Sequence, residues 1–67
     1  MTITVNGKAM DVGEELSVEA LLAQLGVPPL FTAVAVNRDV MPKSAYASTR
    51  LVAGDRVEIV RPMGGGA

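Results

Sequence analysis

The 67-residue chain contains no cysteine and no histidine, and these two absences exclude several classes of function. Without cysteine, the chain has no disulfide and no thiol nucleophile. Without histidine as well, zinc sites built on Cys or His ligands and catalytic Ser-His or Cys-His pairs are excluded. The sequence therefore predicts no metal site and no catalytic residues of its own, which argues against a stand-alone enzyme.

Basic charge and long apolar runs are also scarce. Six Lys and Arg residues against seven Asp and Glu give a net charge of −1 and a pI of about 5.1, so there is no basic surplus for binding nucleic acid. No apolar run approaches the ~20 residues of a membrane span, and the N-terminus lacks the pattern of a secretion signal. We therefore expect a cytoplasmic protein that binds neither nucleic acid nor membranes.

Aromatic residues are limited to Phe31 and Tyr46, whereas 49% of the chain is hydrophobic. The core must therefore be built mainly from aliphatic side chains, and the chain is too apolar to be disordered. Its length is sufficient for one domain.

The first twelve residues have the pattern of a β-hairpin. Ile3 and Val5 alternate with polar residues, which is the period of a half-buried strand. Asn6-Gly7 follows, and this pair favours a type I′ turn because both turn positions need positive φ. The sequence therefore predicts that Lys8 to Val12 forms the return strand.

Residues 17 to 25 have the pattern of an amphipathic helix. Ser17 is suited to the N-cap, because its hydroxyl can accept a hydrogen bond from a free N–H of the first turn. Gly26 is suited to the left-handed position that ends a helix, and Pro28-Pro29 prevents its continuation. The apolar residues that recur at helical spacing are Val18, Leu21, Leu22 and Leu25.

The middle of the chain predicts one strand and several minor elements. Ala33 to Asn37 is almost wholly apolar, which is typical of a central strand buried on both faces. The minor elements are a turn at residues 37–39, an irregular segment at 40–42, a short helical turn at 44–48, a brief edge strand at 49–51 and a turn at 53–55.

A last strand is predicted from Arg56 to Arg61, because polar and apolar residues alternate there. Pro62 ends this strand, since proline has no N–H to donate to a sheet. The three glycines that follow have no side chains to pack, so a mobile tail is expected. Val57 and Ile59 are predicted on one face of the strand, and Glu58 and Val60 on the other.

This order of elements predicts an α+β fold with one main helix on one face of a mixed sheet. It resembles the β-grasp fold of ubiquitin-like proteins and, among these, the ThiS family of thiamine-pathway sulfur carriers. The resemblance implies a β-grasp domain of residues 1–61, with four to five strands, and a flexible tail of residues 62–67. It is carried by Ile3–Gly7, Ser17–Leu22, Ala35–Asn37, and Ala53–Val60 running into Gly64–Gly66.

The resemblance implies chemistry at the C-terminal carboxylate, with no bound cofactor. In such carriers an E1-like adenylyltransferase of the ThiF type uses ATP to adenylate the terminal glycine. A sulfur donor such as a cysteine desulfurase then converts it to a thiocarboxylate, which a ThiG-type thiazole synthase uses. Carried onto this sequence, the reacting residue is Gly66, and Gly64, Gly65 and Gly66 enter the partner active sites. The protein would then be a co-substrate and not an enzyme.

One residue departs from the family pattern, because the chain ends in Ala67 instead of glycine. Either a protease removes Ala67 and leaves Gly66 terminal, or Ala67 is an artefact of the sequence. Both explanations are favoured over direct activation of alanine.

Apolar residues near the tail predict a partner-binding surface on the sheet face that the helix leaves uncovered. Methionine suits such a surface, since its flexible side chain adapts to more than one partner. An arginine beside the tail can pair with an acidic group of the partner. The predicted surface comprises Met41, Leu51, Ile59, Arg61 and Met63, with Val57 as a further member.

Four acidic residues lie close together in the sequence around the start of the helix. A docking surface for a basic partner is one interpretation. We favour the other, a solvated face combined with the preference of acidic residues for helix starts. The four are Asp11, Glu14, Glu15 and Glu19.

Two alternatives stay open at this point. The chain can be a sulfur carrier for another pathway, such as the small subunit of molybdopterin synthase or a carrier for amino-acid synthesis. It can also be a β-grasp binding module whose glycine tail is inert.

Overall fold

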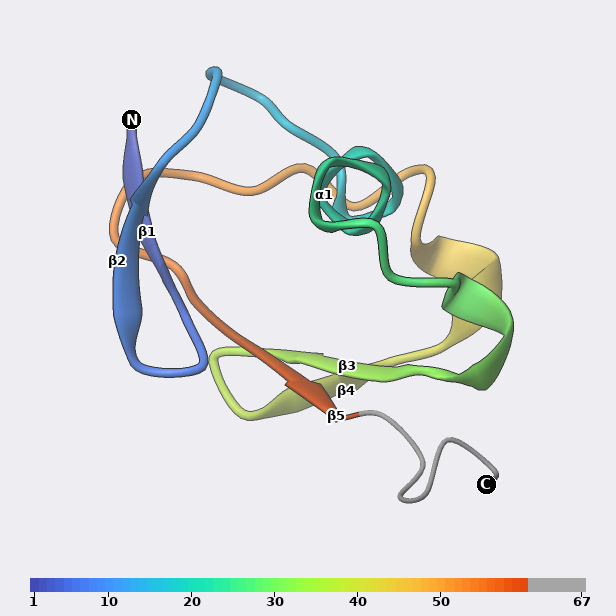
Figure 1. Ribbon diagram of the computed structural model, residues 1–67. Coiled ribbons are helices and arrows are strands. Elements are labelled where there is room, and N and C mark those ends of the chain that lie inside the picture. The colour runs from blue at the N-terminus through green and yellow to red at the C-terminus, as the bar shows by residue number, and fades with distance from the viewer. Residues whose placement is uncertain (61–67) are drawn as a thin grey trace.

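A computed structural model describes residues 1–60, except for the side chain of Phe31. A mixed five-stranded sheet curls around one α-helix (Figure 1), so the predicted α+β class is confirmed. The strand order across the sheet is β2-β1-β5-β3-β4. The elements are β1 (Thr2–Val5), β2 (Lys8–Asp11), α1 (Val18–Leu25), the 3₁₀ helix η1 (Pro29–Phe31), β3 (Ala33–Val36), β4 (Asp39–Met41), the 3₁₀ helix η2 (Lys43–Ala45) and β5 (Arg56–Val60).

The predicted N-terminal hairpin is confirmed. Asn6 and Gly7 have φ values of 51° and 84°, so both turn positions are left-handed as a type I′ turn requires. This turn sets a register in which Ile3 faces Met10. Beyond the ladder, the N-terminal ammonium group of Met1 donates to the carbonyl oxygen of Val12 at 2.7 Å, which ties down the first residue.

The predicted helix and both of its ends are also confirmed. The Ser17 hydroxyl accepts a hydrogen bond from the Ala20 N–H at 3.0 Å, and Gly26 adopts the left-handed conformation with φ of 70°. The apolar side of α1 faces the sheet, and its residues Val18, Leu21 and Leu22 are buried there. Amphipathic spacing and two capping residues therefore account for the position of the helix.

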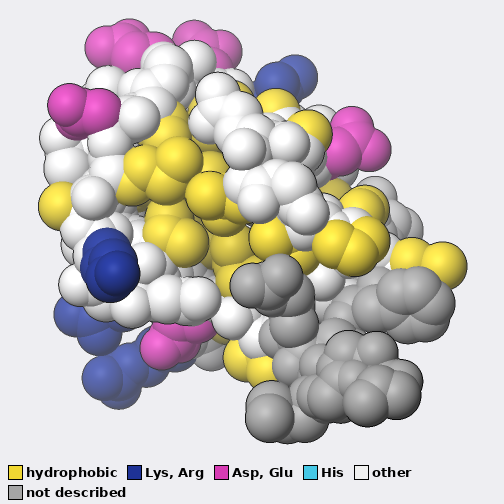
Figure 2. Space-filling view, in the orientation of Figure 1, with side chains coloured by type: hydrophobic (Ala, Val, Ile, Leu, Met, Phe, Trp, Pro, Cys, Tyr) yellow, Lys and Arg dark blue, Asp and Glu magenta, His cyan; other side chains and the backbone are white. Residues whose placement is uncertain are grey.

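The core lies between α1 and the concave face of the sheet, which we call the inner face. β5 runs through the centre of the sheet, parallel to β1 and antiparallel to β3. Its alternation is as predicted, with Val57 buried on the inner face, and Glu58 and Val60 exposed on the outer face. Apolar side chains also reach the surface between α1 and the β1–β2 hairpin (Figure 2), and the half-buried Val5 and Met10 of that hairpin pack against the core.

The prediction that residues 33–37 are buried on both faces is wrong. Val34 and Val36 are buried on the inner face, but Ala33 is exposed on the other. The described residues contain one α-helix, which covers only the inner face and leaves the outer face to solvent. Alanine at the outward positions made the segment look uniformly apolar.

Residues 39–41 form the edge strand β4, where the sequence predicted the last residue of a turn and then an irregular segment at residues 40–42. A tight turn at Asn37 and Arg38, with φ values of 52° and 70°, folds β4 back onto β3. Both positions are left-handed, as in the first hairpin, but arginine does not signal such a turn. The sequence therefore predicted the turn but not β4, the strand that follows it.

Residues 49–51 do not form the predicted edge strand. They make one isolated bridge, between Arg50 and Ser17, and the Leu51 N–H donates to the Leu16 carbonyl at 2.8 Å. The segment thus pairs with the loop before α1 and not with the edge of the sheet. The helical turn predicted at residues 44–48 begins one residue earlier, as η2.

Candidate functional site

The predicted reacting segment follows directly after the central strand. β5 ends at Val60, which pairs with Ala33 of β3. The predicted domain boundary after residue 61 lies outside the described residues. So do the predicted site residues Arg61, Met63, Gly64, Gly65 and Gly66, and Ala67. The described part of the site is therefore the end of β5 and the surfaces beside it.

Asn6 contacts the end of β5 from the first hairpin turn. Its side-chain Oδ1 accepts a hydrogen bond from the Ile59 N–H at 2.8 Å. Its Nδ2 donates to the Ile59 carbonyl oxygen at 3.3 Å. Both backbone groups of the penultimate residue of β5 are therefore bound by one side chain, 53 residues away in the sequence.

An apolar strip crosses the outer face of the sheet at this end. Val60 and Val40 are 64% and 75% exposed, although both are large apolar residues. They are linked across β3, because Ala33 lies opposite Val60 and Ala35 lies opposite Val40. The outer apolar strip, as we call it, consists of Val40, Ala35, Ala33 and Val60.

Among the described residues of the predicted partner surface, some are half-buried and others are fully buried. Met41 and Ile59 both lie opposite Val34 on the inner face, where they are half-buried and pack against the core. Leu51 and Val57 are 1% and 0% exposed, so their assignment to a partner surface is wrong. Both side chains belong to the core. The partner roles of Met63 and Arg61 stay predictions.

Sequence reasoning missed the outer apolar strip. Its members are far apart in sequence, and they form one surface only through the pairing of β5, β3 and β4. The one local signal was the pair of alanines facing outward on β3. That signal was read as burial on both faces, and Val40 was placed in an irregular segment.

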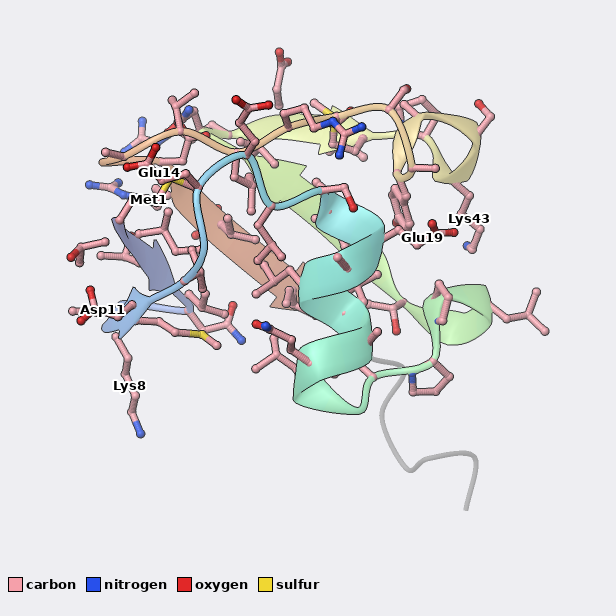
Figure 3. All side chains as sticks on the ribbon, turned by 90° about the horizontal axis from the view of Figure 1, so that it is seen from above. Met1, Lys8, Asp11, Glu14, Glu19 and Lys43 are labelled. Carbon is pink, nitrogen blue, oxygen red and sulfur yellow. The ribbon has the colours of Figure 1, made fainter. Side chains whose placement is uncertain are left out.

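The acidic residues do not form one patch. In Figure 3, Asp11 and Glu14 lie on the hairpin side of α1, whereas Glu19 lies on the opposite side, where Lys43 also projects. Among residues 1–60, no group of three metal-ligating side chains is close enough together to hold a metal ion. Within the same range, no helix is long and apolar enough to cross a membrane.

Comparison with known proteins gives consistent matches over the whole chain. The model of the ThiS family matches residues 3–66. The crystal structure of the thiamine biosynthesis protein (ThiS) from Geobacter metallireducens is similar, with a TM-score of 0.86 and 39% identity. That match covers 98% of this chain and 100% of the other. A solution NMR structure of a thiamine biosynthesis protein from the same organism gives a TM-score of 0.83 at 38% identity, covering 100% and 90%.

Two curated proteins are similar in sequence. A thiazole synthase of Paramagnetospirillum magneticum is 40% identical over all 67 residues, but this chain spans only 21% of that protein's length. An uncharacterized protein, ycf40, of Porphyra purpurea is 32% identical over 66 residues, which make up 98% of this chain and 93% of that protein. A region like this chain thus occurs both as nearly a whole protein and as a small part of a larger one.

Proposed function

This chain belongs to the ThiS family, and on that premise we propose that it is a sulfur carrier of thiamine biosynthesis. It acts as a protein co-substrate whose reacting group is its own C-terminal carboxylate. The observation that carries the proposal is the sequence Gly64-Gly65-Gly66, which three residues separate from the end of the central strand of a β-grasp domain. Fully extended, residues 61–66 span about 20 Å, so the end can enter a buried site while the domain stays outside.

The proposed chemistry has three steps, which are adenylation, sulfur transfer and cleavage of a sulfur–sulfur bond, and partner enzymes carry them out. A carboxylate is a poor acyl donor, so a ThiF-type adenylyltransferase first joins the Gly66 carboxylate to the α-phosphorus of ATP and releases pyrophosphate. The terminal sulfur of a persulfide, formed by a donor such as a cysteine desulfurase, then displaces AMP from the acyl carbon. A thiol cleaves the resulting sulfur–sulfur bond and leaves the thiocarboxylate. We propose that the carrier acts in the cytoplasm.

We propose a ThiG-type thiazole synthase as the acceptor of the sulfur. Support comes from the thiazole synthase of Paramagnetospirillum magneticum, in which a region similar to this whole chain is joined to further sequence in one polypeptide. Fusion of two functions in one relative favours contact between the corresponding separate proteins. The glycines suit this transfer, because a backbone without Cβ atoms can pass through a narrow channel and adopt any φ.

The first prediction tests the reacting group. A chain ending at Gly66, incubated with the adenylyltransferase, ATP and the sulfur donor, is expected to gain the mass of one sulfur and lose that of one oxygen. The full chain ending in Ala67 is expected to gain no sulfur until a protease removes the alanine. Intact-mass spectrometry measures both. No gain on the Gly66-ended chain, with the same enzymes charging an established carrier in parallel, contradicts the proposal.

The second prediction concerns the outer apolar strip, which we propose as the partner-contacting surface. In a chain ending at Gly66, Val40→Asp is expected to raise the KM of the adenylyltransferase for the carrier by roughly 30-fold, because a charge would be buried unpaired at the interface. Val52→Asp is the matched control, since Val52 is 60% exposed but lies in the loop before β5. Equal KM values for the two variants, each checked by its melting temperature, would rule out this surface.

A further inference from the structure

The end of β5 loses its backbone partner on one side before the strand ends. β1 pairs with β5 through Thr4 opposite Arg56 and Val5 opposite Val57. The Asn6 N–H makes the next bond, to the Val57 carbonyl at 2.9 Å, and the chain then turns away into β2. Alternate residues of a strand direct their polar groups to the same side. The N–H and carbonyl of Ile59 therefore face the side that β1 has left.

The carboxamide of Asn6 occupies this place. A carboxamide carries one acceptor and a donor side by side, as a peptide group does. Its Oδ1 faces the Ile59 N–H at 2.8 Å and its Nδ2 faces the Ile59 carbonyl at 3.3 Å. The side chain thus continues the parallel ladder by one step beyond the last backbone bond of β1. The left-handed φ of 51° at Asn6 belongs to the turn that leads the backbone of β1 away from β5 and into β2.

We propose that Asn6 is a positioning residue for the reacting end of the chain. By binding both backbone groups of Ile59, it holds β5 in place up to Val60 and so fixes the point from which residues 61–66 continue. The effect on activity rests on the proposed function, whereas the effect on β5 does not.

The contact between Asn6 and Ile59 matters because it sets how much chain must be ordered when the carrier docks. Without this contact, the backbone polar groups of Ile59 lose their partner, and the strand end is held by the pairing of Val60 with Ala33 and by the packing of the Ile59 side chain on the core. Fixing the backbone of one further residue on docking corresponds to roughly a tenfold loss of affinity. The Asn6–Ile59 contact therefore lowers the free-energy cost of ordering the strand end when the enzyme binds the carrier.

Asn37 provides a matched control at the opposite end of the same strand. It also opens a tight turn, with φ of 52°. Its Oδ1 accepts from the Arg56 N–H at 3.0 Å, and its Nδ2 donates to Asp55 Oδ1 at 3.0 Å. Glycine tolerates positive φ, so Asn6→Gly and Asn37→Gly each remove a carboxamide while keeping the turn.

The third prediction is measured first on the isolated carrier, by amide hydrogen exchange in NMR. Asn6→Gly is expected to speed exchange of the Ile59 amide about tenfold, while the Arg56 amide keeps its wild-type rate. Asn37→Gly is expected to do the reverse. An Ile59 amide that exchanges equally in the wild type and in Asn6→Gly would overturn the proposal, whatever the carrier does in the cell.

The second measurement is the kinetics of adenylation by pyrophosphate exchange. In chains ending at Gly66, Asn6→Gly is expected to raise the KM for the carrier roughly tenfold, with kcat within about twofold, because the added ordering cost arises on docking. Asn37→Gly, matched in melting temperature, is expected to keep both values. Equal losses in the two variants overturn the proposal, as does a raised KM without faster Ile59 exchange, which would mark Asn6 as a direct partner contact. A Gly66-ended chain with no other substitution that is never adenylated would contradict the proposed carrier function and leave the exchange result standing.

Discussion

A chain that ends at Met63 is expected to keep its fold and to lose all sulfur transfer. Among residues 1–60, the buried hydrophobic residues of the core lie between Ile3 and Val57. Residues 64–67 are three glycines and one alanine, so their removal takes little apolar side chain from the domain. Its melting temperature is expected to stay within about 3 °C of the full chain's, as for surface changes in a domain of this size. Thiocarboxylate formation and reconstituted thiazole synthesis are expected to fall to the level without carrier. Circular dichroism, intact mass and a thiazole assay measure these three quantities.

Two further chains make this test specific. A chain ending at Gly66 is the positive control. A chain of that same length with Gly64 and Gly65 both replaced by alanine keeps the reach but adds two Cβ atoms, so it separates the need for length from the need for glycine. If the Met63-ended chain supports thiamine synthesis in cells that lack their own carrier, the tail is inert. The chain would then be better described as a β-grasp binding module.

The parts of the fold that were predictable from the sequence depend on signals acting over a few residues. Asn6-Gly7 fixes a turn because both residues tolerate positive φ, and the flanking alternation then needs no distant information. Ser17 and Gly26 determine the ends of α1 in the same local way, through one hydroxyl and one left-handed residue.

The parts that were not predictable depend on distant contacts. Arg38 adopts φ of 70° without a local sequence preference for it, and β4 exists only because this turn brings it onto β3. The outer apolar strip depends on the register between three strands. The Asn6–Ile59 contact depends on the parallel pairing of the first and last strands. The proposed chemistry at Gly66 rests on family resemblance, since three glycines alone indicate only a chain without side chains to pack.

Leu51 illustrates the difference most sharply, because the sequence led to its assignment to the partner surface. In the structure it is 1% exposed, and its backbone N–H is bonded to Leu16 next to α1. The following residue, Val52, is 60% exposed. Two neighbouring aliphatic residues thus have opposite environments. Strand alternation would produce such a difference, but residues 51 and 52 are not in a strand, so it arises from the contacts of the loop.

Leu51→Ala is therefore expected to destabilise the domain severely, and Val52→Ala hardly at all. Removing a buried leucine side chain costs about 2–5 kcal/mol, whereas an exposed truncation stays within about 0.5 kcal/mol. In a domain of this size the first change lowers the melting temperature by at least about 10 °C. Thermal and urea unfolding measure both variants. At a temperature where Leu51→Ala is still folded, its KM for the adenylyltransferase is expected to match the wild type. A stable Leu51→Ala variant with a raised KM would instead place this residue at the partner interface and not in the core.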